Sequence, residues 1–166
     1  MNLNFNKIIF DGALYSIIAS IFILLSLWKA PRIWLHDFPE DIQKLVPGKS
    51  DAEKRLSLMV GIPFLLLLFA GPFLSGLTWK MQSVQLVSYF ALFLHVFLIA
   101  MFFNVVDWLI LDWLLVCTLT PKFMMIPGTE EAKGYKDYKF HFIGFLKGSL
   151  ISLVSSLIIS PVLLLF

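Results

Sequence analysis

Long apolar stretches alternate with shorter polar ones along the whole chain. A helix needs about 20 apolar residues to cross a hydrocarbon layer roughly 30 Å thick, because each residue adds about 1.5 Å. Four stretches meet this requirement: residues 8–28, 56–79, 84–120 and 143–165. The pattern therefore predicts an all-α integral membrane protein with four transmembrane helices, in a single domain over residues 1–166.

The third stretch is too long for a single ordinary span. Residues 84–120 as one helix would be about 55 Å long, nearly twice the hydrocarbon thickness. Polar residues appear near Asn104, where a span that began at residue 84 would end. We therefore expect a transmembrane helix over 84–106 with a helical extension to about 120, and a break or an exit from lipid near Asn104.

Local signals place helix ends in the first polar stretch. An acidic residue, a proline and a further acidic residue predict a short helix over about 39–46. Ser50 and Glu53 have the spacing of a capping box, so the second long helix should begin before its apolar part. Pro63 and Pro72 predict bends in that helix.

Composition and charge agree with a lipid environment and suggest an orientation. Of all residues 59% are hydrophobic and 14% are charged, and the mean hydropathy is +0.87. Eleven of the thirteen Lys and Arg fall at residues 29–55 or 122–147. The positive-inside rule then predicts a multi-pass protein of the cell membrane with both long loops in the cytosol and both termini outside. Acidic residues share the same loops, so nucleic-acid binding is not expected.

Small residues recur every four positions in the first and fourth apolar stretches. Such ridges allow close approach of another helix. We expect the two ridges to pack against each other, or against a neighbouring subunit or another membrane protein. The helix-packing candidates are Gly12, Ser16, Ser20, Gly144, Gly148, Ser152 and Ser156.

Polar side chains inside the third stretch are the main functional candidates, because ionisable groups at membrane depth usually mark a polar pathway or site. These candidates are Asn104, Asp107, Asp112 and His95. The aspartates could instead pair at the interface with basic residues such as Arg32, Lys54, Arg55 or Lys122. His95 could form an interhelical hydrogen bond, for example to a serine of residues 143–165, or act as a proton relay or metal ligand.

The loops supply secondary candidates for a polar or metal site: His36, Asp37, Glu40, Asp41 and His141. Their spacing matches no defined zinc or calcium pattern. Common hydrolase and nucleotide-binding motifs are absent from the sequence. We therefore predict no cofactor and leave the presence of a metal open.

Three functions fit these patterns. The favoured hypothesis is a homo-oligomeric transporter or channel for a small solute or ion, with its polar site at the cytosolic end of the third helix. The first alternative is an accessory subunit of a membrane complex. The second is a membrane-embedded enzyme acting on a lipid-like substrate, which we favour least.

Overall fold

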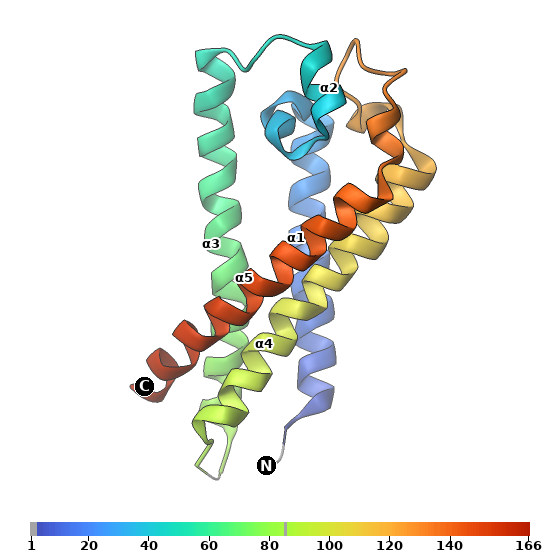
Figure 1. Ribbon diagram of the computed structural model, residues 1–166. Coiled ribbons are helices and arrows are strands. Elements are labelled where there is room, and N and C mark those ends of the chain that lie inside the picture. The colour runs from blue at the N-terminus through green and yellow to red at the C-terminus, as the bar shows by residue number, and fades with distance from the viewer. Residues whose placement is uncertain (1–2, 85) are drawn as a thin grey trace.

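The structure, a computed structural model, describes residues 3–84 and 86–166 and consists of helices and connecting loops, with no β-strand among those residues (Figure 1). The predicted all-helical fold is confirmed, and four helices are long and apolar enough to cross a membrane. The long helices are α1 (Phe5–Lys29), α3 (Asp51–Gln82), α4 (Tyr89–Val106) with its continuation η2 (Asp107–Leu119), and α5 (Tyr138–Leu164).

The two ends of the bundle differ in character. Both termini and the connection between α3 and α4 lie at one end, which we call the termini-side end (Figure 1). The opposite, loop-side end carries the short elements η1 (Pro31–Asp37), α2 (Glu40–Leu45), η3 (Lys122–Met124) and η4 (Lys133–Lys136). Part of the predicted third span, at residues 84–88, precedes the observed start of α4, and residue 85 lies outside the described residues.

Local capping explains where α3 begins. The Ser50 side chain accepts a hydrogen bond from Glu53 N (3.3 Å), and the Glu53 carboxylate accepts one from Ser50 N (2.7 Å). The predicted capping box is therefore confirmed, and it satisfies two amides that a helix start leaves free. The helix continues without interruption through Pro63 and Pro72, so neither proline ends it.

The helix α4 is the centre of the bundle, because α1, α3 and α5 all pack on it. A Cβ atom at Gly12 of α1 would lie 2.8 Å from the ring of Phe102, and one at Gly148 of α5 would collide with the Asn104 amide. The expectation that the two small-residue ridges pack against each other is therefore wrong. Small residues permit close approach to any helix, and here α4 lies between the two ridges.

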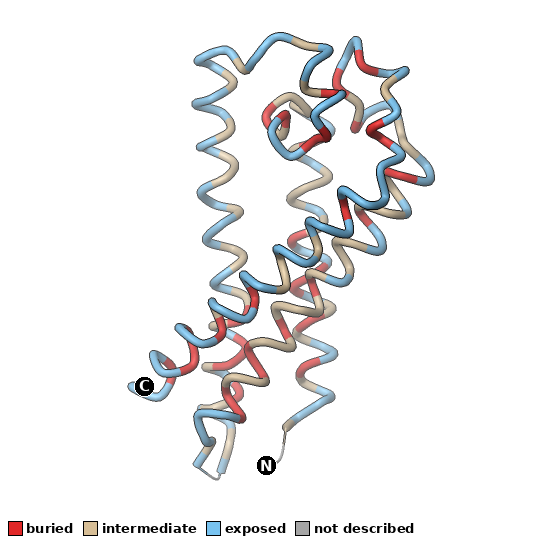
Figure 2. Tube along the Cα trace, in the orientation of Figure 1, coloured by how far each residue is buried: buried red, intermediate tan, exposed pale blue. Residues whose placement is uncertain are grey.

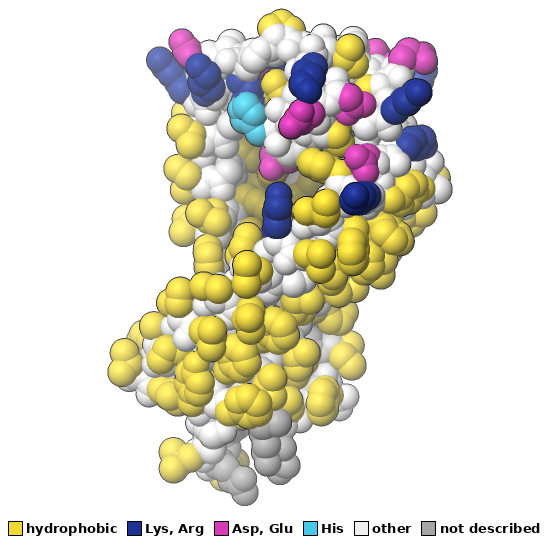
Figure 3. Space-filling view, viewed as in Figure 1, with side chains coloured by type: hydrophobic (Ala, Val, Ile, Leu, Met, Phe, Trp, Pro, Cys, Tyr) yellow, Lys and Arg dark blue, Asp and Glu magenta, His cyan; other side chains and the backbone are white. Residues whose placement is uncertain are grey.

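Packing of α3 is uneven along its length. Its buried residues all lie in its last third, between Pro72 and Trp79. Figure 2 shows the same asymmetry, with exposed and half-buried positions along the loop-side half of α3. Figure 3 shows a recess in this face of the molecule, below the charged loop-side end, with apolar side chains inside it and charged side chains near its rim. By its place in Figure 1, the recess lies between α3 and α5.

The polar loops fold together into a compact unit, which we call the loop-side cap. Its apolar core is formed by Leu27, Leu35, Phe38, Ile42, Met124, Ile126 and Tyr135. The Tyr135 hydroxyl accepts a hydrogen bond from Ile126 N (2.9 Å) and bonds to Thr129 Oγ1 (2.7 Å). Asp41 accepts a hydrogen bond from Gly134 N (2.7 Å), which joins the two loops across the cap.

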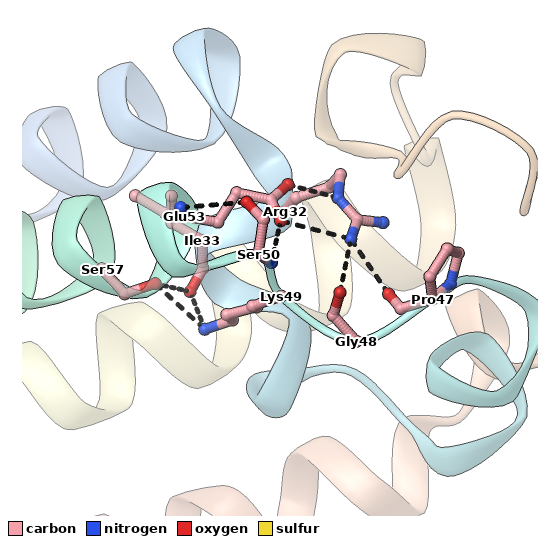
Figure 4. Close-up of polar contacts among 8 residues, drawn as sticks. All are labelled: Arg32, Ile33, Pro47, Gly48, Lys49, Ser50, Glu53 and Ser57. Atoms are coloured by element: carbon pink, nitrogen blue, oxygen red, sulfur yellow. Dashed lines mark hydrogen bonds and ion pairs between the residues drawn. The ribbon is translucent and has the colours of Figure 1, made fainter.

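A polar clamp attaches the cap to the start of α3 (Figure 4). Arg32 Nε donates to the Glu53 carboxylate (2.5 Å), and its Nη2 donates to the Pro47 carbonyl (3.0 Å). Nearby, Lys49 Nζ donates to Ser57 Oγ (3.1 Å), and partial burial lowers the pKa of this lysine. The loop after α1 is therefore held against α3 by ionic hydrogen bonds rather than by apolar contact alone.

Candidate functional site

The segment that carries both candidate aspartates is a π-helix. Its hydrogen bonds join residues five apart, as in the 2.7 Å bond from Thr120 N to Leu115 O at its end. Residues five apart therefore stack on one face, and the rings of Trp108 and Trp113 lie 4.8 Å apart. The expected break near Asn104 is absent, because the chain continues from α4 into η2 with a wider turn. The predicted helical extension to about residue 120 does occur.

This wider turn changes the relation between Asp107 and Asp112. In an α-helix the two would point about 140° apart, whereas the π-helical spacing places them one turn apart on the same face. Asp112 Oδ1 lies 2.9 Å from Nδ1 of His141 in the first turn of α5, and both side chains are mostly buried. The structure thus brings together one primary aspartate and a histidine from the secondary candidates.

Asp107 has a different environment from Asp112. It is half-buried, and among residues 3–84 and 86–166 no side chain or backbone amide forms a hydrogen bond or ion pair with its carboxylate. It lies within electrostatic range of Asp112 and of the Tyr15 hydroxyl. A charged carboxylate in such a place is costly unless water, a cation or a proton compensates it.

Asn104 lies in the contact between α4 and α5 and does not form part of the site with Asp107 and Asp112. Its amide nitrogen donates to the Phe145 carbonyl (3.1 Å) and to Ser149 Oγ (3.0 Å), both on α5. Because its donor capacity is used in this packing contact, Asn104 holds α4 and α5 together next to Gly148. Of the primary candidates on this helix, only the two aspartates therefore form the loop-side acidic site.

His95 belongs to a second polar cluster at the termini-side end. The Ser75 hydroxyl donates to Asp11 (2.6 Å) and lies 2.8 Å from His95 Nε2, and Lys7 forms an ion pair with Asp11 (2.9 Å). Since Ser75 has one proton and gives it to Asp11, His95 donates from Nε2. The imidazole is fully buried and stacks on Trp79 at 4.6 Å. We call Lys7, Asp11, Ser75 and His95 the termini-side network.

The partner of His95 differs from the expected serine of residues 143–165. The serines of α5 bond to carbonyls of their own helix, as Ser152 does to Gly148 O (2.8 Å), and Ser75 of α3 occupies the place beside His95. Sequence reasoning missed Ser75, because a single serine in an apolar helix carries no signal. Lys7 and Asp11 were also missed, although their i,i+4 spacing is a recognisable ion-pair pattern.

The secondary candidates of the first loop do not gather at the acidic site. Glu40 pairs with Lys44 of its own helix (2.8 Å), which lowers the pKa of Glu40, and Asp41 binds the Gly134 amide. His36 and Asp37 are exposed on η1. Within the described ranges, no group of three or more His, Cys, Asp or Glu side chains is arranged to hold a metal ion.

Among the described residues, none of the four basic residues proposed as partners forms an ion pair with either aspartate. Arg32 pairs with Glu53, and Lys54 pairs with Asp51 (3.0 Å). In the described part of the chain, neither Arg55 nor Lys122 forms an ion pair. The predicted pairing of Asp107 and Asp112 with these four cations is therefore wrong, because Arg32 and Lys54 pair with acids at the start of α3 and Asp112 pairs with His141.

Comparisons with protein-family models, with curated proteins and with solved structures found no match to this chain. Its four apolar helices are compatible with a membrane protein, and the polar sites must be interpreted from their own chemistry.

Proposed function

We propose that this polytopic membrane protein binds protons, or a small protonated solute, at Asp107 and carries them across the membrane. The observation that carries the proposal is the half-buried Asp107 carboxylate, which lacks a partner among the described residues. A carboxylate inside an apolar bundle favours a proton or a cation strongly over an empty charged state. This makes Asp107 suited to bind and release positive charge.

The neighbours of Asp107 support proton exchange. Asp112 lies one π-helical turn away, and its contact with His141 (2.9 Å) supplies a second pair of groups that can share a proton. The recess between α3 and α5 would give water or a small solute a route to this region from the loop-side end (Figure 3). We therefore propose Asp107 as the binding group and the Asp112–His141 pair as its proton-exchange partner.

The termini-side network supports transport rather than binding alone. His95 lies on α4, which continues directly into η2, the helix that carries Asp107. The continuous helix α4–η2 therefore contributes to both the termini-side network and the acidic site. Chains of acidic and imidazole groups inside membranes are typical of proton routes. We propose that His95, Ser75 and Asp11 form a second group of proton-binding side chains on the same transport pathway.

We also propose the orientation that the basic loops favour, with the loop-side cap in the cytosol and both termini outside the cell membrane. Cysteine labelling on intact cells provides a test. The background variant is Cys117→Ser, which removes the single cysteine, and two variants are made from it, Lys133→Cys and Met81→Cys. An impermeant maleimide should label the cysteine at Met81, near the α3–α4 connection, and not the one at Lys133. The reverse labelling would contradict the orientation.

Flux measurements test the transport proposal. Proteoliposomes that contain a pH-sensitive dye should acidify after a potassium diffusion potential is imposed, and Asp107→Asn should reduce the rate at least tenfold. Asp51→Asn is the matched control, because Asp51 is an exposed acid at the start of α3. Equal rates for wild type, Asp107→Asn and protein-free vesicles would refute the proposal. We also propose that a homo-oligomer provides the space for the proton route. Light scattering of the detergent-solubilised protein, corrected for bound detergent, would measure its oligomeric state.

A second candidate function is an enzyme that acts on a lipid-like substrate. It is favoured by the contact of Asp112 with His141, since a carboxylate that orients an imidazole is a common general-base arrangement. In this case His141→Gln would abolish turnover of an added amphiphile while proton flux stayed unchanged. Loss of flux with no turnover of any tested amphiphile would favour transport.

A further inference from the structure

An apolar groove lies on the surface at the junction of α1 with the loop-side cap. It is lined by Leu24, Leu25 and Trp28 of α1 and by Phe123 of η3, and it has a volume of about 310 Å³. The groove is shallow and widely open at the surface, and three of its four lining side chains are exposed. Its size is at the lower end of the range for sites that bind small molecules.

Two free cations stand next to this groove in the chain. Lys29 directly follows Trp28 at the end of α1, and Lys122 directly precedes Phe123 at the start of η3. Both lysines are exposed, and neither forms an ion pair or a side-chain hydrogen bond with any residue in the ranges 3–84 and 86–166. Because α1 packs against η3, the two charges are brought to the same corner of the molecule as the apolar groove.

We infer that this corner binds one anionic glycerophospholipid. An acyl chain would fill the groove between Leu24, Leu25 and Phe123, and the phosphate would lie between the ammonium groups of Lys29 and Lys122. Aromatic residues such as Trp28 favour the level of the headgroups, and basic residues beside a membrane helix attract anionic lipids. An apolar groove beside two unpaired cations should bind an amphiphilic anion more tightly than a neutral lipid.

The groove is too small to be the docking surface of a folded protein. Specific protein interfaces bury about 800 Å² on each partner, whereas four side chains line this slot. A single acyl chain is small enough to lie in this groove, and its headgroup would then lie near Lys29 and Lys122. The groove shares no residue with the acidic site, and this inference does not rest on the proposed transport function.

Fluorescence quenching of Trp28 provides the test. The full chain in mixed micelles is titrated with brominated phosphatidylglycerol or brominated phosphatidylcholine, and the Trp28 contribution is obtained by subtracting the signal of Trp28→Phe. We expect half-maximal quenching at a mole fraction of phosphatidylglycerol at least fivefold lower than that of phosphatidylcholine. The double variant Lys29→Gln/Lys122→Gln should lose this preference.

The matched control is Lys44→Gln/Lys133→Gln, which removes the same charge from α2 and η4, two elements that do not line the groove. It should keep the wild-type preference for phosphatidylglycerol. Equal quenching by the two lipids in wild type would overturn the inference. Equal loss of preference in both double variants would also overturn it, because diffuse attraction would then explain the selectivity. Reversal of the quenching by millimolar inorganic phosphate would show a small-anion site instead of a lipid site.

Discussion

Two glycines one turn apart on α5 should respond oppositely to the same substitution. A Cβ atom at Gly148 would collide with the side-chain amide of Asn104, whereas a Cβ atom at Gly144 would meet nothing within 4 Å. Replacing either glycine by alanine favours the helical backbone by about 0.5–1 kcal/mol. Gly144→Ala should therefore raise the free energy of unfolding slightly, and any loss seen in Gly148→Ala must come from the contact with α4.

The size of this loss follows from the bonds that Asn104 makes. Displacing Asn104 removes its two hydrogen bonds to α5, worth about 0.6 kcal/mol each between membrane helices. Overpacking at a close contact costs about 1–3 kcal/mol more. The helix-propensity gain is common to both variants, so Gly148→Ala should be less stable than Gly144→Ala by about 2–4 kcal/mol.

Reversible unfolding in mixed micelles, with the dodecyl sulfate fraction raised stepwise and tryptophan fluorescence as the readout, measures this difference. Adding Asn104→Ala to Gly148→Ala should restore part of the stability, because the double variant lacks the colliding amide. If Gly148→Ala were as stable as Gly144→Ala, close packing of α5 on α4 at Asn104 would be refuted. Sensitivity at Gly144 instead would indicate that this position packs against a second subunit.

Three further substitutions test the polar contacts. Ser75→Ala removes the hydroxyl between Asp11 and His95 and should lower the free energy of unfolding by about 1–3 kcal/mol. The control Ser155→Ala loses only a hydrogen bond within its own helix and should change the free energy of unfolding by less than about 0.5 kcal/mol. Gly134→Ala should open the loop-side cap, because its Cβ atom would collide with the Asp41 carboxylate that bonds to the Gly134 amide. Limited proteolysis should then cleave the loops faster than in Gly48→Ala, where a Cβ atom meets no other atom within 4 Å. Arg32→Gln removes the ionic clamp between the cap and α3 and should cost about 1–2 kcal/mol in the same unfolding assay; an unchanged value would show that the clamp does not contribute to stability.

Most helix positions could be predicted from the apolar pattern and from local capping. The capping box at Ser50 marked the start of α3, and the predicted end of the third stretch at about residue 120 lies one residue from the end of η2 at Leu119. The π-helix could not be predicted, since hydropathy does not distinguish five-residue from four-residue hydrogen bonding. As a result, the sequence suggested a break near Asn104 where the structure has a continuous helix.

The candidate site was predictable in part. Asp107, Asp112 and His95 stand out because ionisable groups are rare in apolar stretches. Their partners did not stand out: Ser75 and His141 come from other helices, and nothing in their local sequence links them to the third stretch. The five secondary candidates were chosen by residue type. Glu40 and Asp41 form contacts within the cap, His36 and Asp37 are exposed, and only His141 reaches the acidic site.

The sequence by itself determined that the chain forms four long apolar helices with basic loops at one end, because hydrophobicity and capping act over short distances along the chain. Only the tertiary structure decided that both small-residue ridges face α4, that His95 and Asp112 belong to different clusters, and that Asp107 remains without a partner among the described residues. These features depend on which helices become neighbours. Small residues allow many pairings, and the shape and bonding of larger side chains such as Phe102 and Asn104 select among them.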